Sequence, residues 1–241
     1  MYTDILEAVE TGSQSHLDAC IVDTVIRSRR AIRAFRPDAV SKDDIVEILD
    51  VARTAPSNSN TQPWNVHVLH GRAKLELSEA LGQAHVADDC PPLQHLPNPL
   101  PEVCRSWQED FGARYYGALG IDKADVASRA RATGRNFDFF GAPVGFIFTI
   151  DARLKKYSWL DCGIFLQTLM LAARARGLDT CAQVSFARYQ TVIAQKLKLE
   201  PGFDVVCGMS LGYADENSVV NKLGLPRATV EQFATFLGFD G

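Results

Sequence analysis

The chain has 241 residues, of which 46% are hydrophobic and 22% charged, enough for a sizeable core in one large domain or two small ones. Its 25 Lys and Arg against 29 Asp and Glu give a net charge of −4, which argues against general nucleic-acid binding because that function needs a basic surface. The sequence contains no run near the roughly 20 apolar residues that span a bilayer, and no signal-peptide pattern at its start. We therefore expect a cytoplasmic protein without a membrane partner.

Cysteine and histidine spacing gives no support to a metal site. The six cysteines are spread thinly, and no two form a C-x-x-C pair. His67 and His70 lie three apart on a predicted strand and so point to opposite faces, which is poor metal geometry. We predict no bound metal and a reducing compartment.

The first third of the chain predicts helices and one strand. Apolar residues recur at helical spacing in 17–30 and again in 42–54, where Ser41 is a suitable N-cap. The alternating run WNVHVLH at 64–70 predicts a strand, and 72–86 a further helix.

The middle of the chain changes character. Segment 87–110 contains five prolines, which makes regular backbone hydrogen bonding unfavourable and is typical of a lid or binding loop. Residues 109–136 are expected to be helical, and the apolar run 141–151 predicts a buried strand.

The strongest predicted helix covers 158–176, with Ser158 as its cap and Gly177 at its end. It is apolar on nearly every side, so it should be buried all round, either centrally or against a partner subunit. Segments 178–184 and 203–212 read as two more strands.

The tail 213–241 is partly apolar and has no obvious place in a closed domain. Strands and helices are mixed without a regular βαβ alternation. An α+β fold is therefore favoured over a parallel sheet.

Three clusters could carry chemistry. Arg29, Arg30 and Arg33 would share a helix face, where guanidinium groups can grip a phosphate or carboxylate; the alternative is a solvated basic surface. The loop 56–64 (PSNSNTQPW) offers hydrogen-bonding groups to a polar heterocycle, or is only a connecting turn. Segment 181–185 ends a predicted strand, where backbone groups often meet a ligand; the alternative is an ordinary strand end.

Common nucleotide and hydrolase signatures are absent from the sequence. It contains no G-x-x-x-x-G-K-[ST] loop, no G-x-G-x-x-G after a strand and no G-x-S-x-G elbow. A built-in NAD domain and an α/β-hydrolase are therefore disfavoured.

Three motifs together resemble the FMN-dependent nitroreductase family. They are SRRAIRAF at 28–35, APSNSNTQPW at 55–64 and GLDTCAQ at 177–183. The phrases NFDFFGAPVGFIFTID and SWLDCGIFLQTLMLAARARGL look closer still to the branch of bacterial nitrobenzoate and other nitroaromatic reductases. The resemblance runs from about residue 22 to the C-terminus.

The resemblance implies a set of FMN-binding residues. Arg29, Arg30 and Arg33 match the arginine motif that meets the flavin phosphate and the carbonyl side of the ring, with Ala31 at a position often held by serine. The other matching residues are Pro56, Ser57, Asn58, Asn60, Gln62, Ala182, Gln183, Val184 and Arg227.

Within this set, Ser57 and Asn58 match residues that reach the flavin across a dimer interface. Arg227 matches a C-terminal arginine at the phosphate, and Leu225 stands where a second basic residue is common. Lys222 is a candidate substitute for that missing charge. No side chain is expected to act as a nucleophile or acid–base catalyst.

The resemblance also implies one nitroreductase-like domain over 1–241, an α/β sandwich with a mainly antiparallel sheet, working as an intertwined homodimer. Residues 1–20 would form an N-terminal extension, 87–136 a lid or insertion, and 213–241 an arm around the partner subunit. Phe111, Tyr115 and Tyr116 are our candidates for substrate contact, since aromatic rings stack on flat substrates.

The implied activity is reduction of nitroaromatic compounds by NADH or NADPH, in two hydride transfers through flavin N5. Other readings stay open: quinone or ene reduction, reductive dehalogenation, a non-catalytic flavin-binding protein, or a flavin-free structural dimer.

Overall fold

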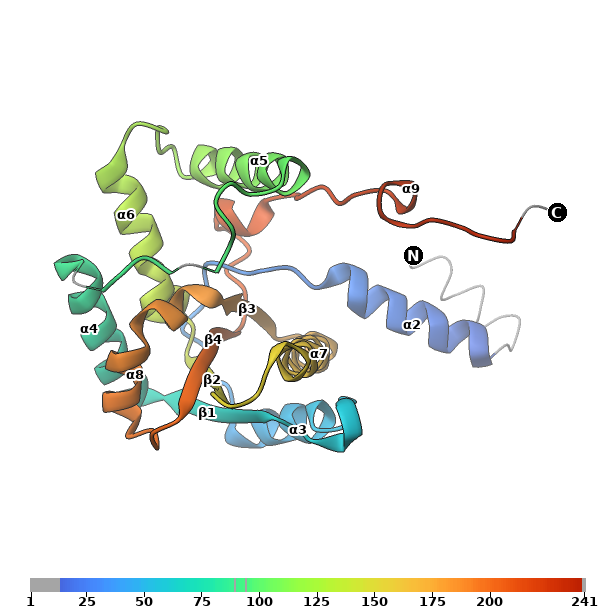
Figure 1. Cartoon of the computed structure of the whole chain (residues 1–241), viewed down its shortest axis with the longest axis horizontal. Helices are drawn as coiled ribbons and strands as arrows, with labels where there is room; N and C mark the ends of the chain where they lie inside the picture. The colour runs from blue at the N-terminus through green and yellow to red at the C-terminus, as the bar shows by residue number, and fades with distance from the viewer. Residues whose placement is uncertain (1–13, 89, 94, 240–241) are drawn as a thin grey trace.

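A single antiparallel sheet organises the computed structural model, which describes residues 14–88, 90–93 and 95–239. Its strands are β1 (Trp64–His70), β2 (Val144–Asp151), β3 (Asp179–Gln183) and β4 (Phe203–Gly212), in the spatial order β1-β2-β4-β3. All neighbouring pairs are antiparallel. The four predicted strands and the α+β class are confirmed (Figure 1).

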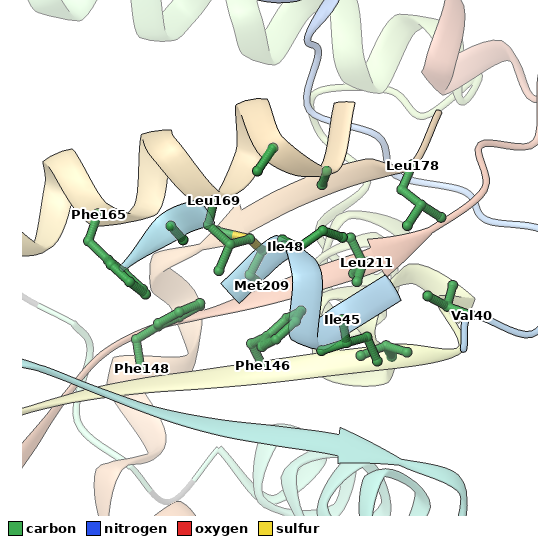
Figure 2. Close-up of a cluster of buried hydrophobic side chains, with 14 of the residues drawn as sticks. Val40, Ile45, Ile48, Phe146, Phe148, Phe165, Leu169, Leu178, Met209 and Leu211 are labelled. Carbon is green, nitrogen blue, oxygen red and sulfur yellow. The ribbon is translucent and has the colours of Figure 1, made fainter. Parts of the chain in front are cut away.

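One face of the sheet is covered by α3 (Lys42–Ala52) and α7 (Lys156–Ala175). Because strand residues alternate between faces, Phe146 and Phe148 of β2 point to this layer. Figure 2 shows the labelled side chains of both helices meeting those of the sheet in one cluster of buried residues. This cluster is the larger of the two main cores.

The opposite face is covered by α4 (Gly71–Ala87), the 3-10 turns η2 (Arg135–Gly141) and η3 (Val184–Tyr189), and α8 (Gln190–Leu197). Ile147 of β2 faces this second core, between the two phenylalanines that face the first. Two glycines allow close packing there. A Cβ at Gly145 would lie 2.5 Å from the Phe139 ring, and one at Gly208 would lie 2.6 Å from the Phe186 ring.

Helix α3 forms where the capping residue and the apolar spacing predicted it. The backbone N–H of Asp44 donates to Ser41 Oγ at 3.0 Å, so Ser41 is the N-cap. Ile45, Ile48 and Ala52 form the buried stripe. Helix α4 likewise covers the predicted segment 72–86.

The predicted helix 17–30 ends early. Helix α2 runs from Gln14 to Ser28, and the chain is then extended, with Ala31 bridging Thr180 of β3 in parallel. The Ile32 N–H donates to the Thr180 carbonyl at 3.1 Å, and the Ile32 side chain is buried. Pairing with the edge of the sheet and burial of Ile32 therefore override the local helical pattern. The prediction that the arginines share a helix face is wrong.

The predicted helix 109–136 is two helices, α5 (Glu102–Ala118) and α6 (Val126–Gly134). Between them Gly120 adopts a φ of +65°, and Asp125 caps α6 through the Ser128 N–H. Helix α7 begins at Lys156 with Lys155 as N-cap, so Ser158 lies inside its first turn and is not the cap. Gly177, with a φ of +74°, follows the helix end as expected.

Two segments project from the sandwich. Helix α2 and the stretch after η4 (Val219–Lys222), which carries α9 (Val230–Phe233), extend from the same side of the body (Figure 1). Phe233, Phe236 and Phe239 are 65–80% exposed on this stretch. Leu160 of α7 is 62% exposed, so one chain does not bury that helix on all sides, and the alternative of a fully central helix is wrong.

The N-terminal extension was predicted over 1–20, and its first thirteen residues lie outside the described residues. Within the described residues, no helix combines the length and apolar character needed to cross a bilayer.

Candidate functional site

A cleft of about 450 Å³ lies where the extended segment after α2 meets the segment that follows η4. We call it the arginine cleft. Its lining residues are Ile26, Arg27, Arg29, Arg30, Ala31, Arg33, Val220, Asn221, Leu223, Gly224, Leu225 and Arg227. The structure thus brings together the arginine motif and Arg227, which are almost 200 positions apart in sequence.

The charge of the arginine cleft is one-sided. Five arginines and no acidic residue line it, although the whole chain carries a net charge of −4. Burial lowers the pKa of Arg29, and the neighbouring charge of Arg227 lowers it further. Two guanidinium groups held together without a carboxylate form a site that an anion would stabilise.

Arg33 is held from two sides. Its guanidinium carbon lies 5.0 Å from the centre of the Phe111 ring and 5.4 Å from that of Tyr115, both on α5. Its backbone N–H donates to Asn221 Oδ1 at 2.8 Å. The side chain of Arg33 therefore lies between the arginine cleft and the predicted lid helix.

Asn221 is a residue that the sequence reasoning missed. Its side chain is buried and joins three segments, because its Nδ2 group donates to the carbonyls of Ala34 at 2.7 Å and Asp215 at 2.9 Å. With the Arg33 N–H on its oxygen, both side-chain N–H donors and the amide oxygen of Asn221 hold the wall of the cleft. An asparagine after a valine pair carries no distinctive sequence signal. Lys222 beside it is exposed and does not line the cleft.

The arginine cleft is anchored to the C-terminal end of α7. Arg174 donates to Ser28 Oγ at 3.1 Å and to Asp179 Oδ1 at 3.0 Å. This half-buried network ties the last residue of α2 to α7 and β3. It fixes the point at which the chain leaves the helix and Arg29 enters the cleft.

The end of β3 presents backbone rather than side chains. Gln183 is buried, accepts from Ser210 Oγ at 2.7 Å, and donates to the Asn136 carbonyl at 2.8 Å. Ala182 and Val184 on either side are exposed. Since Thr180 uses its outer edge to bind Ile32, Ala182 two residues on turns its N–H and carbonyl to the same edge.

Cys181 lies beneath this edge. Burial raises the pKa of its thiol to about 11, although the charges of Arg33 and Arg29 act to lower it. The thiol therefore stays protonated near neutral pH and behaves as a small core residue.

The second predicted cluster is the loop 56–64, and its side chains from Pro56 to Gln62 are exposed or half-buried. A single turn, η1 (Asn58–Asn60), interrupts it, and Ser59, Asn60 and Gln62 all have a positive φ near 50°. Gln62 donates from its backbone to Ser57 Oγ at 3.0 Å and from its side chain to Asn60 Oδ1 at 3.1 Å. Internal hydrogen bonds hold this strained loop in shape.

Asp161 anchors that loop to the N-terminal part of α7. It is 5% exposed and its Oδ2 accepts the Asn58 N–H at 3.2 Å. The sequence reasoning missed it. A carboxylate at the start of an otherwise apolar helix is a signal that could have found it, since buried acids need a specific partner.

The two predicted clusters do not meet in one chain. The loop is attached at Asp161 and the arginine cleft at Arg174, thirteen residues along α7. At 1.5 Å per residue, the two attachment points are about 20 Å apart. One chain therefore holds the two clusters at well-separated points along the same helix.

The predicted substrate aromatics divide into two groups. Phe111 and Tyr115 stack on each other and lie over Arg33. Tyr116 instead packs under Arg129 of α6, with 4.5 Å between the guanidinium carbon and the ring centre. Within the described ranges, no group of three His, Cys, Asp or Glu residues could hold a metal ion.

Comparison with known proteins gives consistent matches. Residues 26–213 match the nitroreductase family. The chain is 59% identical over 218 residues to a 4-nitrobenzoate reductase of Pseudomonas putida, covering 90% of this chain and 96% of the relative. It is 41% identical over 219 residues to a nitrobenzene nitroreductase of Ectopseudomonas oleovorans, with the same coverage.

A solved structure supports the same match. The FMN-dependent nitroreductase NfnB of Mycobacterium smegmatis, determined in complex with NADPH, aligns with a TM-score of 0.87 at 34% identity. The alignment covers 91% of this chain and 99% of that one. The resemblance in the three motifs thus extends to the whole fold.

Proposed function

Because this chain belongs to the nitroreductase family, we propose that it is an FMN-dependent oxidoreductase that reduces nitroaromatic compounds at the expense of NADH or NADPH. The observation that carries the proposal is the arginine cleft, which Arg29 and Arg227 line together and to which no acidic residue contributes. A cleft of this charge fits a phosphate group. The positive charge of this cleft is a local feature, because the chain as a whole is mildly acidic.

The residues suited to hold FMN fall into three sets. Arg29, Arg30 and Arg227 would bind the phosphate, while Arg33 would stabilise negative charge near N1 and O2 of the ring. The backbone from Ala182 to Val184 would face the N5 edge. Ser57, Asn58, Asn60 and Gln62, together with Pro56, would reach the ring from a second chain.

When bound, FMN supplies hydride transfer through N5, first from the nicotinamide and then, once that has left, to the nitro compound. The protein itself would bind the flavin, orient the substrate and exclude water from the site. Phe111 and Tyr115 over Arg33 offer an apolar cover on the substrate side. No nucleophile or acid–base pair in the chain is required for these tasks.

We propose a homodimer as the functional unit. The separation of the two clusters along α7, the uncovered side of that helix and the exposed phenylalanines after residue 230 all support it. Residues 213–241 would then form an arm on the partner, 87–136 a lid with the substrate aromatics, and 1–20 an N-terminal extension of a single domain. The cytoplasm is the compartment that we propose.

The test is an absorption spectrum of the purified protein, followed by anaerobic addition of NADPH or NADH and then of 4-nitrobenzoate. We expect a yellow protein that bleaches with the nicotinamide and regains colour with the nitro compound. A colourless protein that ignores added FMN would contradict the proposal. A yellow protein that does not bleach would instead indicate non-catalytic flavin binding, and oxidation only by quinones or halophenols would indicate one of the other reactions.

A further inference from the structure

Arg135 is a cation that the proposed flavin site does not use. It is the first residue of η2, it is exposed, and within the described part of the chain no carboxylate lies within ion-pair distance of it. The neighbouring arginines of this region are occupied. Arg129 donates to the Lys123 carbonyl and covers the Tyr116 ring, and Arg131 donates to Ser128 Oγ.

The backbone places Arg135 beside the proposed flavin ring. Asn136, the next residue, accepts from Gln183 Nε2 through both its carbonyl and its side-chain oxygen, at 2.8 and 3.2 Å. Gln183 is the last residue of β3 and lies within the segment proposed to face N5. The backbone of Arg135 is therefore next to a residue that is bonded to the segment proposed to face the ring.

Tyr115 of the lid helix links the two sides. Its ring lies against the guanidinium of Arg33, and its hydroxyl is close enough to both Arg33 and Arg135 that each charge lowers its pKa against the larger, raising effect of burial. The hydroxyl of this buried tyrosine is thus within electrostatic range of Arg33, which lines the arginine cleft, and of Arg135, for which the described residues supply no carboxylate.

We propose that Arg135 binds the carboxylate of an aromatic acid substrate and so selects nitrobenzoate-type anions over neutral nitroarenes. The inference rests on the proposed function. Arginine suits the task because its planar fork can bind both carboxylate oxygens, and because it stays charged at every physiological pH. A carboxylate ligand gains a charge-assisted, two-point contact with this cation that a neutral analogue does not make.

The experiment compares the holoenzyme with Arg135→Gln, and with Arg131→Gln as a matched control that removes the same charge from α6. The substrates are 4-nitrobenzoate and its methyl ester, which has nearly the same shape but no charge. We expect Arg135→Gln to raise KM for 4-nitrobenzoate about tenfold or more, with kcat and the ester's KM within about twofold of wild type. Arg131→Gln should leave both substrates unchanged.

A binding measurement separates this inference from the proposed function. Calorimetric titration of the holoenzyme with benzoate, which has no nitro group to reduce, should give at least tenfold weaker binding in Arg135→Gln than in wild type. Equal affinities, no benzoate binding by wild type, or parallel effects on acid and ester would overturn the role of Arg135. Failure of wild type to turn over any nitroarene would overturn the function, while the benzoate titration still decides on Arg135.

Discussion

The two ends of α7 hold groups of opposite chemistry. Its C-terminal end, through Arg174, supports a cleft lined by five arginines. Its N-terminal part, through Asp161, holds a loop of neutral amides and hydroxyls. One end is suited to a phosphate and the other to the polar edge of a heterocycle. A phosphate-bearing flavin carries both groups in one molecule.

Helix α7 has more apolar surface than its own chain covers. Phe165 and Leu169 are buried against the sheet, whereas Leu160 remains largely exposed. If a second copy covers that exposed side in antiparallel fashion, it brings its loop to the first copy's arginine cleft. The helix would then serve the core of its own chain and the alignment of two half-sites.

The largest expected effect lies at the charged end. Arg29→Ala should weaken FMN binding by about 10- to 100-fold, because a charge-assisted contact to phosphate is lost at a half-buried guanidinium that also feels the charge of Arg227. Arg33→Ala should also weaken flavin retention or slow turnover. The measurement is a fluorescence titration of apoprotein with FMN.

The matched control for this pair is Arg36→Ala. Arg36 belongs to the same extended segment but forms an exposed ion pair with Asp38 at 3.0 Å and does not line the cleft. It should bind FMN as wild type does. Normal colour and kinetics in both cleft variants would contradict a role of the arginine cleft in FMN binding.

At the neutral end, the expected effect is smaller. Asp161→Asn keeps an acceptor for the Asn58 N–H but removes the charge, so the loop is held less firmly. We expect FMN affinity to fall by about 2- to 10-fold. Asp50→Asn, at an exposed carboxylate paired with Arg53, serves as the control and should have no effect. Identical FMN affinities in the two variants would contradict a role of the loop in flavin binding.

Gln183 distinguishes a structural role from a ligand contact. Gln183→Ala leaves Ser210 and Asn136 without their partner in a buried place, which should cost about 1–3 kcal/mol of unfolding free energy. FMN affinity of the folded protein should change less than in Arg29→Ala. Chemical denaturation and FMN titration on the same preparation provide both numbers, and the reverse pattern would mean that the side chain itself meets the flavin.

The smallest effect on the folded core is expected in the projecting stretch. Phe236→Ser removes a side chain that is 65% exposed, so the stability of one isolated chain should change by no more than about 0.5 kcal/mol. Dimer dissociation, followed by sedimentation at decreasing concentration, should nevertheless shift to higher concentration. An unchanged dissociation curve would mean that this residue does not contact the partner.

Periodicity was sufficient to predict the regular core. The strands at 64–70 and 203–212 and the cap at Ser41 follow from short-range patterns, and the structure has them. The position at which α2 ends could not be predicted from such patterns, because the competing interaction is a bridge between Ala31 and Thr180, which are far apart in sequence. Local propensity carries no information about such a partner.

The candidate site shows the same division. The arginines and the Asn/Gln loop stand out as residue types, so the sequence alone suffices to propose them as flavin-binding residues. Asp161 and Asn221 hold other residues in place, through hydrogen bonds that include partners more than 100 positions away. Their importance becomes visible only once the chain is folded.

The most direct test of the two-chain site is complementation between two variants. One chain carries Arg29→Ala and Arg33→Ala, and the other carries Asn60→Ala and Gln62→Ala; differently tagged, they are co-expressed and the mixed dimer is purified. Each homodimer should retain little FMN, while the mixed dimer, with one intact site, should hold about half of the wild-type content. Mixed dimers as empty as either parent would contradict a flavin site that combines the cleft of one chain with the loop of the other.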